Sequence, residues 1–219
     1  IKIANQEDDL ESLTRQYEFH RQMDSSVKLL SNDELIQLTN ANVEPAYGAI
    51  HIPSDGQINA NKYTKALFKS LQQHYITRYY HQEVQSIDRR NGYYAVCTDQ
   101  MSPIEAHKVI VASGAWSSQL LKNYSLPREV IGVKGEVLLL EHDELDLKET
   151  LFMTNGCYIV PKQPNRFLIG ATSEFNNYSV GTSEGGLNWL LDHASARVPE
   201  LKNSRVLKEW SGVRPYTNN

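Results

Sequence analysis

The spacing of apolar residues predicts three amphipathic helices. One covers Asp8–Met23, a second begins after Asn59, whose side chain can cap it, and a third follows Thr182, the expected N-cap. The apolar stripes of the three helices are Leu10, Leu13 and Tyr17; Ala60, Tyr63, Leu67 and Leu71; and Leu187, Leu190, Leu191, Ala194 and Val198. A shorter helix is predicted after Ser31, which forms a capping-box pattern with Glu34.

Short apolar runs between these helices predict strands. The predicted strands cover Ala46–Ile52, Val84–Asp88, Tyr93–Thr98, His107–Ala112, Val130–Leu140, Cys157–Val160, Phe167–Ala171 and Val206–Val213. Asn91-Gly92 lies between two of them and favours a hairpin with a type I′ turn, because both residues tolerate positive φ. The mixture of helices and strands without strict alternation predicts an α+β or mixed α/β chain.

The run Val109–Val111 is continuously apolar, which is typical of a strand buried on both faces. It ends in Ala112-Ser113-Gly114, where small side chains allow a ligand or another backbone to come close. From the spacing alone, tight packing of a strand against a helix explains the small residues equally well.

Composition and charge exclude several classes of protein. The chain has 219 residues, 40% hydrophobic, and a formal net charge of −4, which argues against a nucleic-acid partner. No apolar run is long enough to cross a bilayer, and no signal peptide precedes the first helix. The two cysteines, Cys97 and Cys157, are expected to be buried free thiols in a reducing cytoplasm, and no residues show metal-ligand spacing.

The sequence contains no self-sufficient catalytic motif and no G-x-G-x-x-G opening a helix. Two side chains remain candidates for substrate binding. Tyr158 should point away from Cys157 and Ile159, where its phenol could donate to a carboxylate or simply lie on the sheet surface. Arg214 ends an apolar strand, where its guanidinium could bind a carboxylate in bidentate fashion or form a surface ion pair.

Five segments in register resemble the flavin-dependent family that contains glycine oxidase, monomeric sarcosine oxidase and D-amino-acid oxidase. The resemblance is strongest to bacterial glycine oxidases of the thiamine-biosynthesis type, and it extends over nearly the whole chain. The matching segments are Val109–Ser117, Val133-Lys134-Gly135-Glu136, Cys157–Pro161, Gly170-Ala171-Thr172 and Trp210–Thr217.

The resemblance implies a substrate domain with a large mixed β-sheet flanked by helices, plus part of a Rossmann-like FAD-binding domain. Residues 1–53 and 119–213 would be the two parts of the substrate domain. Residues 54–118 would return to the FAD-binding domain, and residues 214–219 would begin a second return. The protein would be cytoplasmic, and homo-oligomers are compatible with the resemblance.

The resemblance also implies site residues and a reaction. FAD would be contacted by Val84, Ala112, Ser113 and Gly114, while Arg214 and Tyr158 would bind the substrate. A small amine or amino acid would lose its α-hydrogen as hydride to the flavin, the imine would hydrolyse, and dioxygen would reoxidise the flavin with formation of peroxide. No side chain need act as a catalytic acid or base.

Other outcomes stay open on the sequence. The chain could come from a sarcosine oxidase, a D-amino-acid dehydrogenase or a tRNA-modifying oxidase domain, or it could be a non-catalytic domain of the same fold. The absence of G-x-G-x-x-G, and of the segment that follows the last match in the family, predicts that the 219 residues alone bind little flavin and are inactive. The sequence identifies neither the amine nor the electron acceptor.

Overall fold

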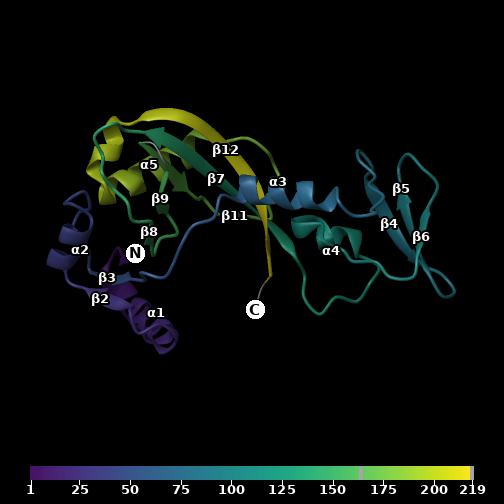
Figure 1. Ribbon diagram of the computed structural model, residues 1–219, viewed down its shortest axis with the longest axis horizontal. Coiled ribbons are helices and arrows are strands. Elements are labelled where there is room, and N and C mark those ends of the chain that lie inside the picture. Colours follow the sequence, from purple (N-terminus) through teal and green to yellow (C-terminus); the bar gives the residue numbers. More distant parts are fainter. Residues whose placement is uncertain (163–164, 218–219) are drawn as a thin grey trace. The chain divides into compact units, whose positions relative to one another are not determined.

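The computed structural model describes residues 1–162 and 165–217 of the chain (Figure 1). The chain divides into two compact units. The first combines Ile1–Ser54 with Gly132–Arg214, and the second comprises Asp55–Ile131 with the described residues from Pro215.

The first unit is built on a large mixed sheet in the order β11-β7-β10-β9-β8-β1-β3-β2, with β12 also paired to β7. Strand β1 pairs with β8 in parallel, whereas β7·β10 and β9·β10 are antiparallel. This mixed α/β architecture confirms the predicted fold class. Its strands are β1 (Lys2–Ala4), β2 (Lys28–Leu30), β3 (Gly48–His51), β7 (Ile131–Glu141), β8 (Leu151–Met153), β9 (Tyr158–Lys162), β10 (Arg166–Gly170), β11 (Glu174–Phe175) and β12 (Arg205–Tyr216).

Helices cover both faces of this sheet at different places. Helix α1 (Leu10–Met23) follows the 3-10 turn η1 (Glu7–Asp9) and buries Leu13 against Ala4 and Ile50. Helix α2 (Asn32–Leu38) begins at the predicted capping box of Ser31 and Glu34. Helix α5 (Glu184–Arg197) and the 3-10 turn η3 (Pro199–Asn203) pack on the other face and complete the main core.

The side chains of β7 identify the two faces of the sheet, one directed toward α5 and the other away from it. Leu138 and Leu140 of β7 share a core with Leu190 and Ala194 of α5. Because side chains alternate along a strand, Lys134 and Glu136 face α5 as well, whereas Gly135 lies on the opposite face.

The second unit contains an antiparallel sheet, β4-β5-β6, and two helices. Its elements are α3 (Ala60–Leu71), β4 (Val84–Arg89), β5 (Tyr94–Thr98), β6 (Ile104–Ala106), the 3-10 turn η2 (Gly114–Trp116) and α4 (Ser117–Leu120). Asn59 caps α3 as predicted, since its side chain accepts a hydrogen bond from the backbone N–H of Lys62 at 3.0 Å. The apolar stripe of α3 buries no residue within the described part of the chain.

The prediction of a buried strand over His107–Ala112 is wrong for this structure. The third strand of the small sheet is β6 instead, and Ile110 is 92% exposed. A strand that is buried on both faces needs neighbouring strands and covering helices, and no described strand pairs with this segment.

Three local predictions also need correction. The N-cap of α5 is Ser183, whose hydroxyl accepts from the N–H of Gly186, because Thr182 instead donates to Glu209. In the β4–β5 hairpin only Gly92 has a positive φ, so the turn is not type I′. Cys157 is buried as predicted, but Cys97 is only half-buried.

The two units do not by themselves assign a flavin or a substrate role to either part. The domain roles, with their boundaries at 53, 118 and 213, therefore remain predictions. No helix within residues 1–162 and 165–217 is both long and apolar enough to span a membrane. The same residues contain no group of three or more His, Cys, Asp or Glu side chains arranged to hold a metal ion.

Candidate functional site

Tyr158 lies on the sheet face that points away from α5. Its neighbours Cys157 and Ile159 are fully buried in the core with α5, so the alternation of β9 places the phenol on the opposite side, as predicted. Its cross-strand partner is Gly170, and a Cβ built there would collide with the ring and hydroxyl of Tyr158. The ring therefore lies over a position that only glycine can occupy without displacing it.

Phe152 extends this aromatic surface. It pairs with Tyr158 across β8 and β9, and the two ring centroids are 5.8 Å apart. Phe152 is partly exposed, so the two rings form an accessible apolar wall. Sequence reasoning missed Phe152, because one aromatic residue in a three-residue strand carries no signal.

Arg214 reaches the loop that follows β10. Its Nη2 donates to the backbone carbonyl of Thr172 at 3.0 Å and to the hydroxyl of Ser173 at 2.9 Å. Within the described residues, Nη1 and Nε have no acceptor, and no carboxylate forms an ion pair with Arg214. The geometry thus gives no support to the surface ion pair that the sequence left open.

Gly135 makes room for this guanidinium. A Cβ built at Gly135 would lie 3.3 Å from Nη2 of Arg214 and 3.2 Å from the carbonyl oxygen of Thr172. Because these contacts are tight, a side chain at position 135 would push the guanidinium or the loop away.

Electrostatics couple the two predicted substrate residues. Burial raises the pKa of the Tyr158 phenol, and the positive charge of Arg214 partly opposes this rise. Tyr158 is therefore a neutral hydrogen-bond donor at physiological pH. Burial also raises the pKa of the Cys157 thiol to about 12, so this cysteine stays protonated and unreactive.

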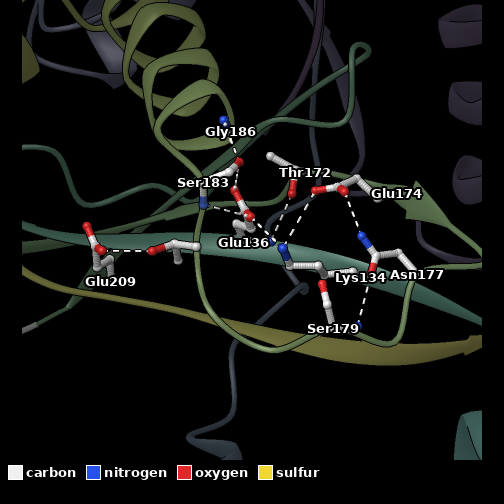
Figure 2. Close-up of polar contacts among 10 residues, drawn as sticks. Lys134, Glu136, Thr172, Glu174, Asn177, Ser179, Ser183, Gly186 and Glu209 are labelled. Atoms are coloured by element: carbon white, nitrogen blue, oxygen red, sulfur yellow. Dashed lines mark hydrogen bonds and ion pairs between the residues drawn. The ribbon is translucent and has the colours of Figure 1, made fainter.

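A buried ion pair between Lys134 and Glu136 lies on the face of β7 that is directed toward α5 (Figure 2). Lys134 Nζ lies 2.9 Å from a carboxylate oxygen of Glu136, and the Glu136 side chain is fully buried. The same carboxylate accepts from the backbone N–H of Ser183 at 3.0 Å and from the Ser183 hydroxyl at 3.2 Å. The Glu136 carboxylate lies at the N-terminal end of α5, where the helix dipole makes a negative charge favourable.

The backbone of Glu136 ties the strand to the loop that holds Arg214. Its N–H donates to the Thr172 hydroxyl at 2.9 Å, and its carbonyl accepts from the N–H of Thr172 at 3.3 Å. Sequence reasoning quoted Thr172 and Lys134–Glu136 only as parts of matching segments. Their contacts require the pairing of distant strands, which no local pattern reveals.

The second unit contains a cleft with a volume of about 700 Å³. Three of the four residues predicted to contact FAD line it, namely Val84, Ala112 and Ser113. Gly114 is not among the lining residues; it begins η2 with a positive φ of 58°. Trp116 also lines the cleft, and sequence reasoning had not assigned it a role.

The walls of this cleft suit a flat, largely apolar group. The volume falls within the range of small-molecule sites, and Val109–Val111 supply apolar side chains. Within the described residues, the backbone groups of Lys108–Ala112 take part in no hydrogen bond. Those donors and acceptors remain available, so this surface fits part of a dinucleotide, although contact with FAD remains a prediction.

Comparison with known proteins decides the family. A sequence model of the family described as FAD-dependent oxidoreductase matches residues 1–219. The chain belongs to the FAD-dependent oxidoreductase family.

Several known proteins are similar to this chain in sequence and structure. The chain is 34% identical to a glycine oxidase of Geobacillus kaustophilus over 99% of its own length and 58% of the relative's. It is 30% identical to a glycine oxidase of Bacillus subtilis over 99% of this chain and 57% of the relative. The crystal structure of the Geobacillus kaustophilus enzyme matches with a TM-score of 0.91, at 34% identity, over 99% of this chain and 58% of that one.

These figures confirm the predicted resemblance to the family and to glycine oxidase. They also show that the chain spans a little over half the length of these two glycine oxidases. Family membership implies FAD as the cofactor, and the residues that bind it here stay predictions.

We predict that Lys134→Met lowers the midpoint of thermal unfolding by several degrees at neutral pH, because it leaves the buried Glu136 carboxylate without its counter-ion. The hydrogen bond to Glu136 raises the pKa of Lys134 above its ordinary value of 10.5. This stabilisation is fully present below pH 10.5 and is lost as the pH rises through the higher value of the folded state.

The difference between wild type and Lys134→Met should therefore be constant up to about pH 10 and shrink above it. The double variant Lys134→Met/Glu136→Gln removes both charges and should recover part of the loss. Scanning calorimetry at several pH values tests this prediction. An unchanged midpoint for the single variant at pH 7 would contradict it.

Proposed function

We propose that this chain is part of an FAD-dependent oxidase that deaminates glycine or another small amine or amino acid. The observation that carries the proposal is Arg214, whose Nη1 and Nε have no acceptor among the described residues. Its positive charge acts on the neutral phenol of Tyr158. The similarity to glycine oxidases supports the same substrate class.

In this proposal Arg214 and Tyr158 bind the carboxylate of the substrate. Arg214 supplies positive charge and free N–H donors, and Tyr158 supplies a phenolic O–H. Phe152 and Tyr158 form an apolar wall that limits the size of the substrate side chain. A site of this kind orients its substrate and excludes water, and it needs no side chain as acid or base.

Bound FAD would supply the redox chemistry by accepting hydride from the α-carbon of the amine, and dioxygen would then accept the electrons as peroxide. On the protein side, Val84, Ala112 and Ser113 would line the cofactor cleft together with Trp116. We include Gly114 in this proposal because its positive φ turns the chain from that cleft into η2.

The proposal predicts that glycine, sarcosine or a small D-amino acid bleaches the flavin of the full-length protein under anaerobic conditions. Absorbance near the flavin maximum is the measurement, and peroxide should appear when air is admitted. A flavin that binds normally but is bleached by none of these compounds would contradict the proposed substrate class.

For the same protein, we predict that Arg214→Ala raises KM for the best amino acid by about 10- to 100-fold, because the substrate loses its charge-assisted hydrogen bonds. The rate constant of flavin reduction at saturation should fall much less. Arg205, an exposed arginine on the same strand that pairs with Glu141, offers the control variant Arg205→Ala. An unchanged KM for Arg214→Ala would remove the carboxylate role.

The 219 residues alone should bind little or no flavin, because they lack the glycine-rich turn at a helix N-terminus that meets the pyrophosphate. The purified chain should therefore be colourless and inactive after incubation with FAD and gel filtration. A yellow fraction with a protein-bound flavin spectrum would contradict this prediction.

A further inference from the structure

The Ser173 hydroxyl has one hydrogen-bonding function that the protein does not use. Arginine has no acceptor, so in the 2.9 Å contact with Arg214 the Ser173 oxygen accepts and its own hydrogen is left over. Ser173 is exposed, and within the described residues its O–H meets no acceptor. The contact with Nη2 also fixes where this hydroxyl lies relative to the guanidinium.

The same contacts change how Arg214 can meet a carboxylate. Nη2 carries two hydrogens, and both are directed to protein oxygens, one on Thr172 and one on Ser173. Both bidentate forks of a guanidinium use Nη2, so the fork predicted from the sequence is already engaged. Arg214 has Nη1 and Nε left to donate, and a second directional donor for a carboxylate must come from another residue.

The surrounding charges favour an anion at this position. Glu174 follows Ser173 in the chain, but its carboxylate accepts from Asn177 at 2.8 Å and lies 4.0 Å from Lys134. No carboxylate of the described residues therefore neutralises Arg214. A hydroxyl held against an unneutralised guanidinium is a strong donor to an incoming carboxylate, because its oxygen is already polarised.

We propose that Ser173 is a substrate-binding residue, whose hydroxyl accepts from Nη2 of Arg214 and donates its hydrogen to the carboxylate that Arg214 binds. This inference rests on the proposed function. In this role Ser173 makes the loop after β10 a determinant of specificity, because its hydroxyl favours ligands that carry a carboxylate to accept the hydrogen bond.

The test uses the full-length, FAD-loaded protein and acetate, a carboxylate that is not oxidised. The dissociation constant is read from the perturbation of the flavin spectrum. Ser173→Ala should weaken acetate binding about tenfold, which corresponds to the loss of one hydrogen bond to a charged group. Ser173→Thr keeps the hydroxyl and should stay within about twofold to threefold of wild type, less than the loss of that hydrogen bond.

Ser179 offers a matched control. It is exposed in the segment that follows β11, and its backbone N–H, rather than its hydroxyl, donates to the side chain of Asn177 (Figure 2). Ser179→Ala should leave acetate binding unchanged. Acetate binding by Ser173→Ala equal to wild type would overturn the inference about Ser173.

Double variants separate direct contact from positioning. If Ser173 donates to the ligand, adding Ser173→Ala to Arg214→Ala still weakens binding. If the additional effect vanishes, Ser173 acts only through Arg214 and the direct contact is overturned. Wild-type protein that binds acetate and is bleached by an amino acid, with an unaffected Ser173→Ala, would overturn this inference alone. Wild-type protein that does neither would overturn the proposed function as well.

Discussion

The carboxylate of Glu136 is the constraint on which the rest of the first unit depends. It is fully buried, and a buried charge is tolerated only when it is paired and hydrogen-bonded. Lys134 and both polar groups of Ser183 meet that requirement, and they come from β7 and from the start of α5. Strand and helix are therefore held in one register, because any slip of β7 by one residue would turn the carboxylate away from its donors.

The position of the candidate substrate site follows from this register. With Glu136 directed toward α5, Gly135 must lie on the other face, where the guanidinium of Arg214 packs over it. Because β7 pairs with β10 and β10 pairs with β9, Gly170 and Tyr158 lie on the same face of the sheet as Gly135. Both glycines are required by close approach and not by a positive φ. They provide a flat floor on which a large cation and an aromatic ring can lie.

The sequence predicted most of this fold because its signals are local. The apolar stripe of α1, the capping box at Ser31 and the alternation around Tyr158 each depend on residues a few positions apart, and each agrees with the structure. The N-cap of α5 was misplaced by one residue because Thr182 and Ser183 carry equivalent hydroxyls. The contacts of Thr182 with Glu209 and of Ser183 with Glu136, both from distant strands, distinguish them.

The prediction of a buried strand around Val109–Val111 was wrong for a different reason. Its composition is typical of a strand that is buried on both faces of a sheet. Composition alone does not show which strands, if any, pair with it. Candidate site residues divide in the same way. Val84, Ala112 and Ser113 were found through resemblance and line one cleft, whereas Phe152 was missed because its significance lies in its partner on a neighbouring strand.

Charge balance around Arg214 connects the architecture to the proposed chemistry. A cation beside an aromatic surface would ordinarily be neutralised by a neighbouring acid, and Glu174 is close enough in sequence to do so. The alternation of β11 and β7 instead sends Glu174 toward Lys134 and Asn177, on the side of the buried pair. Glu174 is the only acidic residue next to Ser173 in the sequence. Lys134, which pairs with the Glu136 carboxylate at the start of α5, thus also draws Glu174 away from Arg214. This leaves the positive charge of Arg214 for a ligand, and it links the stability of the sheet to the anionic character of what the site can bind.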